Sequence, residues 1–476
     1  MKKFVIALAA SLLVGGGVAN AKSEKRGVCV NGFKMEQMEL LEPGICWYYN
    51  WGTSHTLATV EGVDFCPMGW SGINADAVRK YCKEHPEVKY LLGYNEPNFE
   101  NQANLTPQKA AEMWPEMQAL AKELNLKLVS PALNFSPNPP YQDPYKWMDE
   151  FVALVGKDAF DFVAIHNYGG LGVMKSFATG FHEKYGKPVW VTEWCYWPGG
   201  AGNVYVSPDT QIKSMIESVQ WLEQTDFIFR YSWFMATGTY DAPERPNYGL
   251  VKTEGNLSTY TYALTPQGYV YTYMSDFDKS VWNAESEWVP AALVTDAYNL
   301  GYGQGESDHT DYPLMVTNLP AEGYAEYQFE IAAGDRCLVM MVGGYGEPTR
   351  FDPTLKVTAT HEDGTVVDIF NKQFTLPNHD RADMTLALPF NAPKAGKYTV
   401  RVAAEGRNSG IILGALMIGD ASGIESIETA TDAAASLVDV YTVAGVKVRS
   451  AVAPAAATLG LPAGFYIVGN QKVLVK

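Results

Sequence analysis

Two glutamates, Glu96 and Glu193, each end a short apolar run, and aromatic residues flank both of them. The first belongs to the run at 89–97 (KYLLGYNEP) and the second to the run at 188–194 (PVWVTEW). Near-continuous apolar runs are typical of strands buried on both faces of a parallel sheet. Two carboxylates at such strand ends can together break a glycosidic bond. One protonates the departing oxygen, while the other attacks the anomeric carbon or activates water.

Polar side chains lie beside the two glutamates. Asn95 is expected to donate a hydrogen bond to a substrate hydroxyl, and Pro97 predicts extended backbone at Glu96, because a proline disfavours helical backbone in the residue before it. Tyr168 ends another apolar run and is expected to donate to the attacking carboxylate and hold it ionised. His166, on the same run, is either a substrate contact or a histidine satisfied within the core.

Aromatic residues are concentrated at the same predicted strand ends. Sugar rings present apolar C–H faces that pack on large flat side chains, but these side chains also fill cores, so we expect roughly half of them in each role. Those predicted to bind substrate include Trp47, Trp194 and Trp197. The full set is Trp47, Trp51, Trp70, Tyr94, Tyr168, Trp194, Tyr196, Trp197, Tyr231 and Trp233.

Seven apolar runs alternate with amphipathic helical stretches between about 44 and 234, which predicts an α/β domain. A doubly wound sheet and a closed (β/α)8 barrel both fit this alternation. In a barrel, Glu96 would end a strand at the carboxyl end, where barrels build their active sites. The barrel's missing eighth strand is expected near 53–62, unless the barrel is irregular. Helices are predicted to begin at Pro107 and Pro208 and to cover about 145–155, and Pro115 is expected to kink or split the first of these.

The pattern changes after about residue 277. Residues 324–418 form short alternating stretches separated by turn residues, which predicts a β-sandwich. The predicted organisation is a TIM-like barrel followed by a β-sandwich and a small C-terminal β unit. Its segments are a signal peptide at 1–21, the barrel domain at 22–285, an accessory or carbohydrate-binding-like sandwich at 300–420, a linker at 421–436 and the terminal unit at 437–476.

The chain has 476 residues and a formal net charge of −17. Such a surface repels nucleic acid and anionic membranes and disfavours a strongly acidic polysaccharide as substrate. Residues 1–21 contain two lysines, an apolar run and an Ala-Asn-Ala ending, which predicts a secretory signal peptide cleaved before Lys22. No later segment is long and apolar enough to predict a membrane span.

The sequence lacks HExxH, Walker, strand-linked GxGxxG and GxSxG motifs, so we expect neither a metal site nor a cofactor. Six cysteines match no zinc or redox spacing, and most are expected to be buried thiols. The alternative is one disulfide among the first four, which are Cys29, Cys46, Cys66 and Cys82.

Several motifs in order resemble glycoside hydrolase family 128, one of the clan A barrel hydrolases. They are GYNEPN at 93–98, IHNYG at 165–169, VTEWCYW at 191–197, YSWFM at 231–235 and the closing stretch LTPQGYVYTYMSDF at 264–277. The resemblance covers about 40–277. It implies that Glu96 is the acid/base and Glu193 the nucleophile. It also places Asn95 against the hydroxyl next to the reacting carbon and Trp233 in the subsite of the attacked sugar.

That family acts on β-1,3-glucans, usually from within the chain and without a cofactor. The resemblance therefore implies a retaining endo-β-1,3-glucanase with a neutral β-glucan polysaccharide or oligosaccharide as its partner. Two alternatives stay open: a hydrolase of another neutral β-glycan, such as a mannan, galactan or mixed-linkage glucan, and a surface glycan-binding protein without activity.

Residues 437–476 resemble the sorting tail of the type IX secretion system, with VYTVAGVKV and LPAGFYIV followed by a lysine-bearing final strand. The resemblance implies that the secretion machinery is a partner during export. It also implies a protein secreted, or held at the cell surface, after crossing both membranes. A terminal edge hairpin is the plainer interpretation.

Overall fold

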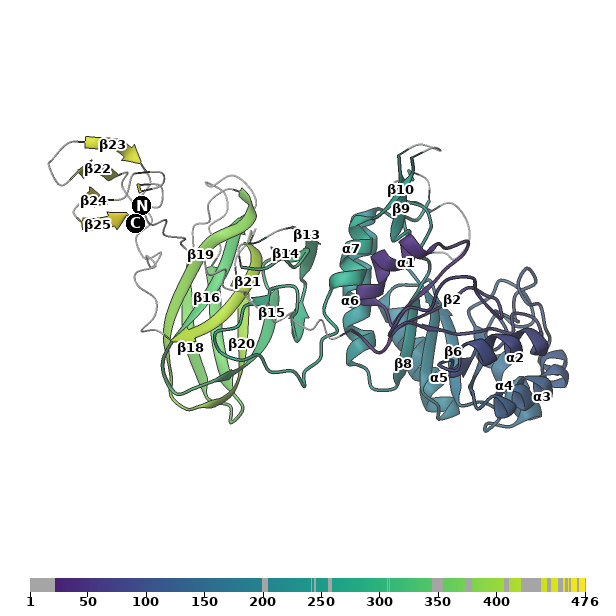
Figure 1. The fold of residues 1–476 in the computed structure, drawn as a ribbon. Helices are drawn as coiled ribbons and strands as arrows, with labels where there is room; N and C mark the ends of the chain where they lie inside the picture. Colours follow the sequence, from purple (N-terminus) through teal and green to yellow (C-terminus); the bar gives the residue numbers. More distant parts are fainter. Residues whose placement is uncertain are drawn as a thin grey trace, which may run out of the picture.

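The computed structural model describes residues 22–475 apart from several gaps. These gaps are 199–203, 241, 244, 256–258, 306, 308, 345–353, 374–378, 406–410, 421–437, 443–446, 453–456, 459–460, 462–463 and 469–470. The predicted signal peptide and linker thus lie outside the described residues. Figure 1 shows an α/β barrel, then a two-sheet β-sandwich, then a small four-stranded sheet. This confirms the predicted fold class.

The barrel has eight parallel strands in the order β3-β2-β1-β8-β7-β6-β5-β4. A bridge between Met68 and Leu92 joins the two outer strands, so the sheet closes into a barrel and is not doubly wound. The strands are β1 (Arg26–Cys29), β2 (Trp47–Tyr49), β3 (Asp64–Phe65), β4 (Tyr90–Leu91), β5 (Lys127–Leu133), β6 (Phe162–Asn167), β7 (Val189–Trp194) and β8 (Ile228–Trp233).

The eighth strand is β1, and its predicted position near 53–62 is wrong, since that segment is an irregular loop between β2 and β3. β1 has only four residues, RGVC, and is too short and too polar to form an apolar run. Its first residue, Arg26, is nevertheless buried. It donates to the carbonyl oxygens of Tyr271, Met274 and Ser275 over 3.0, 3.0 and 2.7 Å. Tertiary contacts therefore stabilise a strand that its own sequence does not predict.

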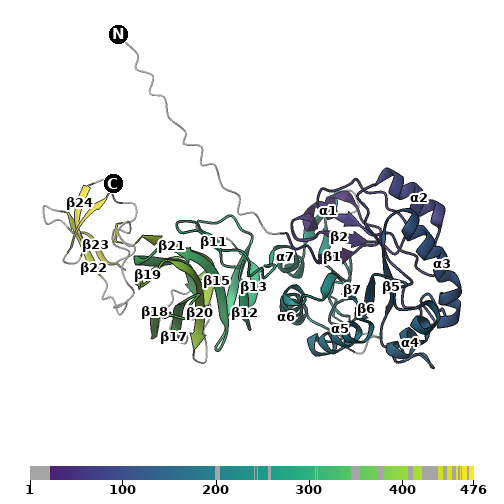
Figure 2. The ribbon, with the colours of Figure 1, turned by 90° about the horizontal axis from the view of Figure 1, so that it is seen from below.

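Helices surround the barrel, as Figure 2 shows in the view from below. The predicted starts at Pro107 and Pro208 are confirmed, with Thr106 and Ser207 as the N-caps. Pro115 lies inside α3, which is not split there. The helices are α1 (Met35–Leu41), the 3-10 helix η1 (Glu42–Gly44), α2 (Ala75–Glu84), α3 (Pro107–Glu123), α4 (Pro144–Val155), α5 (Leu171–Tyr185), α6 (Pro208–Gln224) and α7 (Pro266–Tyr273).

A short hairpin follows β8, and the sandwich follows α7. One sandwich sheet has the order β13-β14-β21-β16-β19, with β11 beside β21, and the other has β12-β15-β20-β17-β18. The hairpin is β9 (Val251–Glu254) and β10 (Thr261–Leu264). The sandwich strands are β11 (Val289–Pro290), β12 (Asp296–Tyr298), β13 (Gly301–Gln304), β14 (Leu314–Leu319), β15 (Tyr324–Ile331), β16 (Gly334–Gly344), β17 (Thr354–His361), β18 (Val366–Gln373), β19 (His379–Ala392), β20 (Gly396–Glu405) and β21 (Ile411–Asp420).

The sandwich lies against the barrel on the side of α6 and α7 (Figure 1). Gln220 on α6 donates to Asp296 Oδ1 over 2.8 Å, and the Tyr312 hydroxyl donates to the carbonyl oxygen of Tyr273 over 2.6 Å. The terminal sheet has the order β23-β22-β24-β25 and comprises β22 (Val438–Thr442), β23 (Lys447–Val452), β24 (Gly464–Val468) and β25 (Gln471–Val475).

All six cysteines are free thiols, so the alternative of a disulfide among the first four is wrong. In the part of the chain that the structure describes, every helix is too short or too polar to cross a bilayer.

Candidate active site

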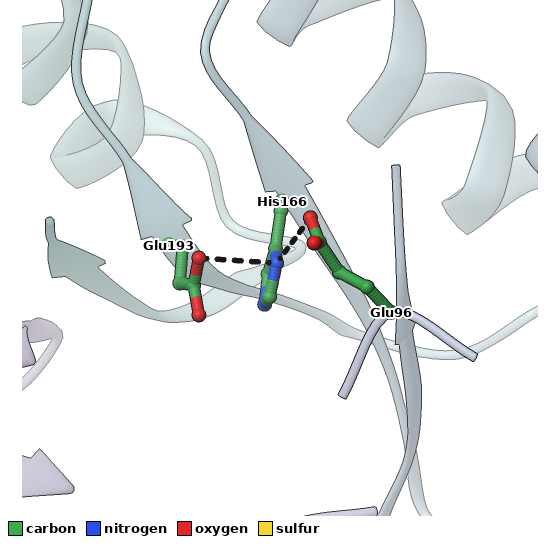
Figure 3. A group of neighbouring side chains, drawn as sticks. All are labelled: Glu96, His166 and Glu193. Carbon is green, nitrogen blue, oxygen red and sulfur yellow. Dashed lines mark hydrogen bonds and ion pairs between the residues drawn. The ribbon is translucent and has the colours of Figure 1, made fainter. Parts of the chain in front are cut away.

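Two carboxylates face each other at the carboxyl ends of the barrel strands. Glu96 follows β4 and Glu193 lies on β7, and only 6% and 4% of their surfaces are exposed. One oxygen of Glu96 lies within 4.8 Å of an oxygen of Glu193. The His166 ring from β6 stands between them, as Figure 3 shows. The structure thus brings together the two glutamates that the sequence analysis selected.

The backbone of Glu96 is left-handed, with a φ of 40°, so the predicted extended conformation is wrong. This conformation costs roughly 1–2 kcal/mol for a residue with a Cβ. Two backbone hydrogen bonds hold it, because the Glu96 amide donates to Ala132 over 2.9 Å and the Phe99 amide donates to the Glu96 carbonyl over 3.0 Å. Strain that neighbours maintain in this way is characteristic of functional positions.

Glu193 receives hydrogen bonds from three aromatic side chains. The Tyr168 hydroxyl donates to Oε2, the Trp51 indole donates to Oε1 over 2.8 Å, and the Tyr49 hydroxyl donates to Oε1 over 3.1 Å. Such donors favour the ionised carboxylate. Glu96 receives a longer bond of 3.4 Å from the Asn134 amide and one from His166. The two acids therefore have unequal support for a negative charge.

The pKa of Glu193 is nevertheless raised above its ordinary value, because burial outweighs the effects that lower it. The charge on His166 and the hydrogen bonds from Tyr168 and Trp51 lower this pKa, and the charge on Glu96 raises it further. The expectation that hydrogen bonds alone would keep this carboxylate ionised is therefore incomplete.

His166 is fully buried, and its Nδ1 lies 3.0 Å from Glu96 Oε1 and 3.3 Å from Glu193 Oε2. Burial lowers its pKa, but the charge on Glu193 and the bond to Glu96 outweigh burial, so the pKa is raised. The interpretation as a substrate contact is wrong, because no part of the ring reaches the surface of the cleft. The core interpretation is incomplete, since Nε2 has no hydrogen-bond partner.

Glu96, His166 and Glu193 are also the described residues that could together hold a metal ion, since one donor atom from each lies within 4.8 Å of the others. The histidine donor atom in this cluster is Nδ1, which faces both carboxylates. A cation at this position would have to replace the hydrogen on Nδ1, and it would occupy the space between the two acids.

A cleft of about 600 Å³ opens in front of the pair. Among the predicted binding residues, Asn95, Tyr168 and Trp197 line it. Asn95 donates its amide to Gln102 over 3.2 Å, whereas its Oδ1 is buried without a partner. The second hydrogen of the Asn95 amide is not used by Gln102, so donation from Asn95 to a substrate hydroxyl stays a prediction. The whole lining is Trp51, Trp70, Asn95, Glu96, Phe99, Asn101, Gln102, Asn134, Phe135, Ser136, Pro137, Tyr168, Glu193, Trp197 and Phe234.

Three predicted substrate-binding tryptophans lie elsewhere. Trp47 begins β2 and packs against Trp190 inside the barrel, with ring centroids 4.9 Å apart. Trp194 and Trp233 are buried on the outer face of their strands and pack against each other, with centroids 4.7 Å apart. Trp194 follows Glu193 directly, and successive side chains of a strand point to opposite faces. These three residues contribute to the core and not to the cleft.

Several residues of the cleft were not among those predicted to bind substrate. Trp51 and Trp70 appeared only in the wider set of strand-end aromatics. Asn134 carries the same signal as Glu96, because it is a polar residue directly after a buried strand. Phe99 and Phe135 lie on loops, where no periodic pattern marks a side chain as part of a site.

A closed parallel barrel with two carboxylates at its carboxyl-end cleft is the architecture of a barrel glycosidase. A family model described as Glycosyl hydrolase catalytic core matches residues 27–264. The chain therefore belongs to the Glycosyl hydrolase catalytic core family.

Similar proteins include the alkali-sensitive linkage protein 1 of Schizosaccharomyces pombe, which is 24% identical over 222 residues. That match covers 45% of this chain and 39% of the relative, so the chain spans about two fifths of the relative's length. An endo-β-1,3-glucanase of glycoside hydrolase family 128, subgroup II, from Pseudomonas viridiflava is 32% identical, with a TM-score of 0.45 over 53% of this chain and 98% of that one. Its counterpart from Sorangium cellulosum is 28% identical, with a TM-score of 0.43 over 52% of this chain and 97% of that one.

Proposed function

We propose that this chain is a retaining glycoside hydrolase that cleaves β-1,3-glucan from within the chain. The separation of the two carboxylates carries this proposal, since their nearest oxygens lie within 4.8 Å of each other. Retaining enzymes hold these groups about 5–5.5 Å apart, whereas inverting enzymes need roughly 6.5–9.5 Å to admit a water molecule. The short separation favours direct attack by one carboxylate.

The surroundings of the two acids support different roles for them, with Glu193 as the nucleophile and Glu96 as the acid/base. Glu193 receives three aromatic donors, which suits the carboxylate that must be negative when it attacks the anomeric carbon. Glu96 has fewer donors, the Asn134 amide and His166, which suits the acid that protonates the departing oxygen. Glu96 then takes a proton from the water that releases the sugar from Glu193.

The lining of the cleft supports a neutral glycan as substrate. Its aromatic rings offer stacking surfaces for pyranose faces, and they come from loops that follow several strands of the barrel. Trp51, Trp70 and Phe99 follow β2, β3 and β4, whereas Trp197 and Phe234 follow β7 and β8. Stacking surfaces on several loops suit a substrate that extends beyond the reacting bond, which favours cleavage within a chain. The β-1,3 linkage itself is proposed from the motif resemblance to family 128.

Product analysis tests the proposal. The chain from residue 22 onward would be incubated with a laminarin-type β-1,3-glucan, and separately with a mannan, a galactan and a mixed-linkage glucan. We expect oligosaccharides of several lengths from the β-1,3-glucan and, by NMR, initial release of the β-anomer. Initial release of the α-anomer would contradict retention, and turnover of another glycan alone would contradict the linkage. Binding without turnover would favour a surface glycan-binding protein.

We also propose that the protein is exported through the signal peptide and the type IX sorting tail, and that it works outside the cell or on its surface. The sequence patterns at 1–21 and 437–476 support this route. Expression with and without the tail in a host that carries the type IX machinery tests it. We expect the tailless chain to stay in the periplasm, and its appearance at the surface would contradict the proposal.

A further inference from the structure

One buried nitrogen lies within hydrogen-bond distance of both catalytic carboxylates. Nδ1 of His166 is 3.0 Å from Glu96 Oε1 and 3.3 Å from Glu193 Oε2, and the ring between them is fully buried (Figure 3). The ring does not line the cleft, so a bound sugar cannot touch it. Any effect of His166 on the reaction therefore passes through the two glutamates.

The surroundings of the ring decide which nitrogen carries hydrogen. Nε2 is buried without a hydrogen-bond partner, whereas Nδ1 faces two acceptors. The neutral tautomer with its hydrogen on Nε2 would bury a donor without an acceptor and turn a lone pair toward two carboxylates. In the other neutral tautomer, and in the imidazolium ion, Nδ1 carries hydrogen. Nδ1 is therefore a donor in either charge state that the geometry favours.

The negative charge of a retaining pair moves during the reaction. In the first step a Glu193 oxygen bonds to the anomeric carbon, the glycosidic C–O bond breaks, and the proton of Glu96 goes to the departing oxygen. Glu96 is then the charged group. In the second step water attacks the anomeric carbon, Glu96 takes the proton of that water, and Glu193 leaves as a carboxylate.

We propose that His166 is a positioning residue whose single Nδ1–H supports both steps. It keeps Glu193 ionised for attack before the glycosyl-enzyme forms, and it keeps Glu96 ionised to take the proton of water afterwards. This inference depends on the proposed retaining mechanism. The Nδ1 hydrogen is directed to Glu96 Oε1 over 3.0 Å, and Glu193 Oε2 lies 3.3 Å from the same nitrogen, so only a small reorientation of the ring or of Glu193 is needed to bring the hydrogen to the second carboxylate.

Two other donors each serve one glutamate and provide matched controls. The Tyr168 hydroxyl donates to Glu193, and the Asn134 amide donates to Glu96 over 3.4 Å. Tyr168→Phe should therefore slow the first step, and Asn134→Ala should slow the second. Removal of the His166 donor should slow both.

The experiment uses pre-steady-state kinetics with the 2,4-dinitrophenyl β-glycoside of a β-1,3-linked glucose disaccharide. This leaving group needs no protonation, so the burst rate reports the first step through Glu193, and the steady state reports the second step through Glu96. For His166→Leu we expect both rate constants to fall roughly 10- to 100-fold, the range for a hydrogen bond to a charged group, with little change in KM. His166→Asn, whose amide nitrogen can occupy the Nδ1 position, should recover much of both rates.

A fall in only one rate constant for His166→Leu would overturn the inference, as would a His166→Asn variant no faster than His166→Leu. Thermal unfolding and binding of an uncleaved oligosaccharide check that each variant is folded. A wild-type enzyme that releases the aryl group without a covalent glycosyl-enzyme would instead contradict the proposed function, and the inference with it. A wild-type burst with unaltered His166 variants would contradict the inference alone.

Discussion

At the amino ends of the barrel strands, Arg230 donates a hydrogen bond to Asp64 over 2.8 Å. The guanidinium group of Arg230 also lies above aromatic rings, and its central carbon is 4.7 Å from the ring centroid of Tyr90 and 5.4 Å from that of Trp190. At the carboxyl ends, two acids face each other with one histidine between them, and aromatic rings line an open cleft. Both ends combine aromatic rings with buried charge. The amino end pairs one cation with one anion, whereas the carboxyl end places two acids and one histidine beside a cleft.

This contrast explains why we place the reactive groups at the carboxyl ends of the barrel strands. In the ion pair of Arg230 and Asp64, each charge is matched by the other among packed rings, so we assign this pair a structural role. Two carboxylates that face each other can act as a proton donor and a nucleophile, and rings with an exposed face can bind a sugar. Substitutions at the two ends should therefore separate activity from stability.

The largest effect is expected at the carboxyl end, from Glu193→Ala. Loss of the nucleophile should lower kcat on a β-1,3-glucan by at least about a thousandfold, with the folded state retained. Added azide, a small external nucleophile, should restore cleavage of an activated aryl glycoside and form the α-glycosyl azide. Formation of the β-azide would indicate that Glu193 is not the nucleophile. Glu96→Ala is the paired control, because azide should then yield the β-glycosyl azide.

Two tryptophans four positions apart in the sequence test whether activity and stability depend on different ends of the barrel. Trp51 donates to Glu193, so Trp51→Phe should lower kcat roughly tenfold with little change in unfolding free energy. Trp47 packs inside the barrel, so Trp47→Leu should cost about 3 kcal/mol of stability and leave KM unaltered below the unfolding transition. Denaturant unfolding and glucan turnover measure both. A change in KM for Trp47→Leu would indicate that Trp47 contributes to substrate binding.

The amino-end ion pair should act on stability alone. Arg230→Met leaves Asp64 without its cation and removes the group that the rings surround. We expect a loss of about 3 kcal/mol in unfolding free energy, measured in urea, with kcat unchanged at temperatures where the variant is folded. The double substitution Arg230→Met with Asp64→Leu should recover part of that stability. A fall in kcat without a fall in stability would contradict the separation of the two ends.

The sequence predicts that Glu96 and Glu193 belong to one site because a glutamate at the end of a long apolar run is conspicuous, and the same rule applies to Asn134. It does not predict where within a run the strand begins and ends. Trp47 begins a strand of three residues inside the apolar run at 44–51 (GICWYYNW), so its place at the amino end depends on the barrel closure. Trp194 and Trp233 lie on strands buried on both faces, where an apolar pattern cannot assign an inner and an outer side.

Long-range contacts explain the remaining differences. β1 is missed because it begins with Arg26, whose burial is possible only once the carbonyl oxygens at the end of α7 accept its hydrogen bonds. The position of His166 between two acids from other strands is likewise a product of strand order. Local sequence contains the residue types of a site, whereas the partners of each residue depend on the closed barrel.

The pH dependence of stability should differ between wild type and Glu193→Gln. Burial raises the pKa of Glu193, the charge on His166 opposes this rise, and the charge on Glu96 adds to it. A carboxyl with a raised folded pKa contributes its full stability below the unfolded value of about 4.3 and loses it as pH rises through the folded value. Wild type should therefore match the variant at low pH and unfold at a lower Tm than the variant at neutral pH. The opposite order would indicate a lowered pKa.

The smallest effect is expected from removal of metal ions. Glu96, His166 and Glu193 have donor atoms within 4.8 Å of each other, and a cation there would block attack by Glu193 on the sugar. Hydrolysis by two carboxylates requires proton transfer and a nucleophile, both of which these side chains provide. Dialysis against EDTA should thus change the turnover of β-1,3-glucan by less than about twofold. Added Zn²⁺ should inhibit, because it competes with the hydrogen on Nδ1, and EDTA should reverse that inhibition. A loss of activity with EDTA that Zn²⁺ restores would mean that the carboxyl end balances its charge with a metal ion, much as the amino end does with Arg230.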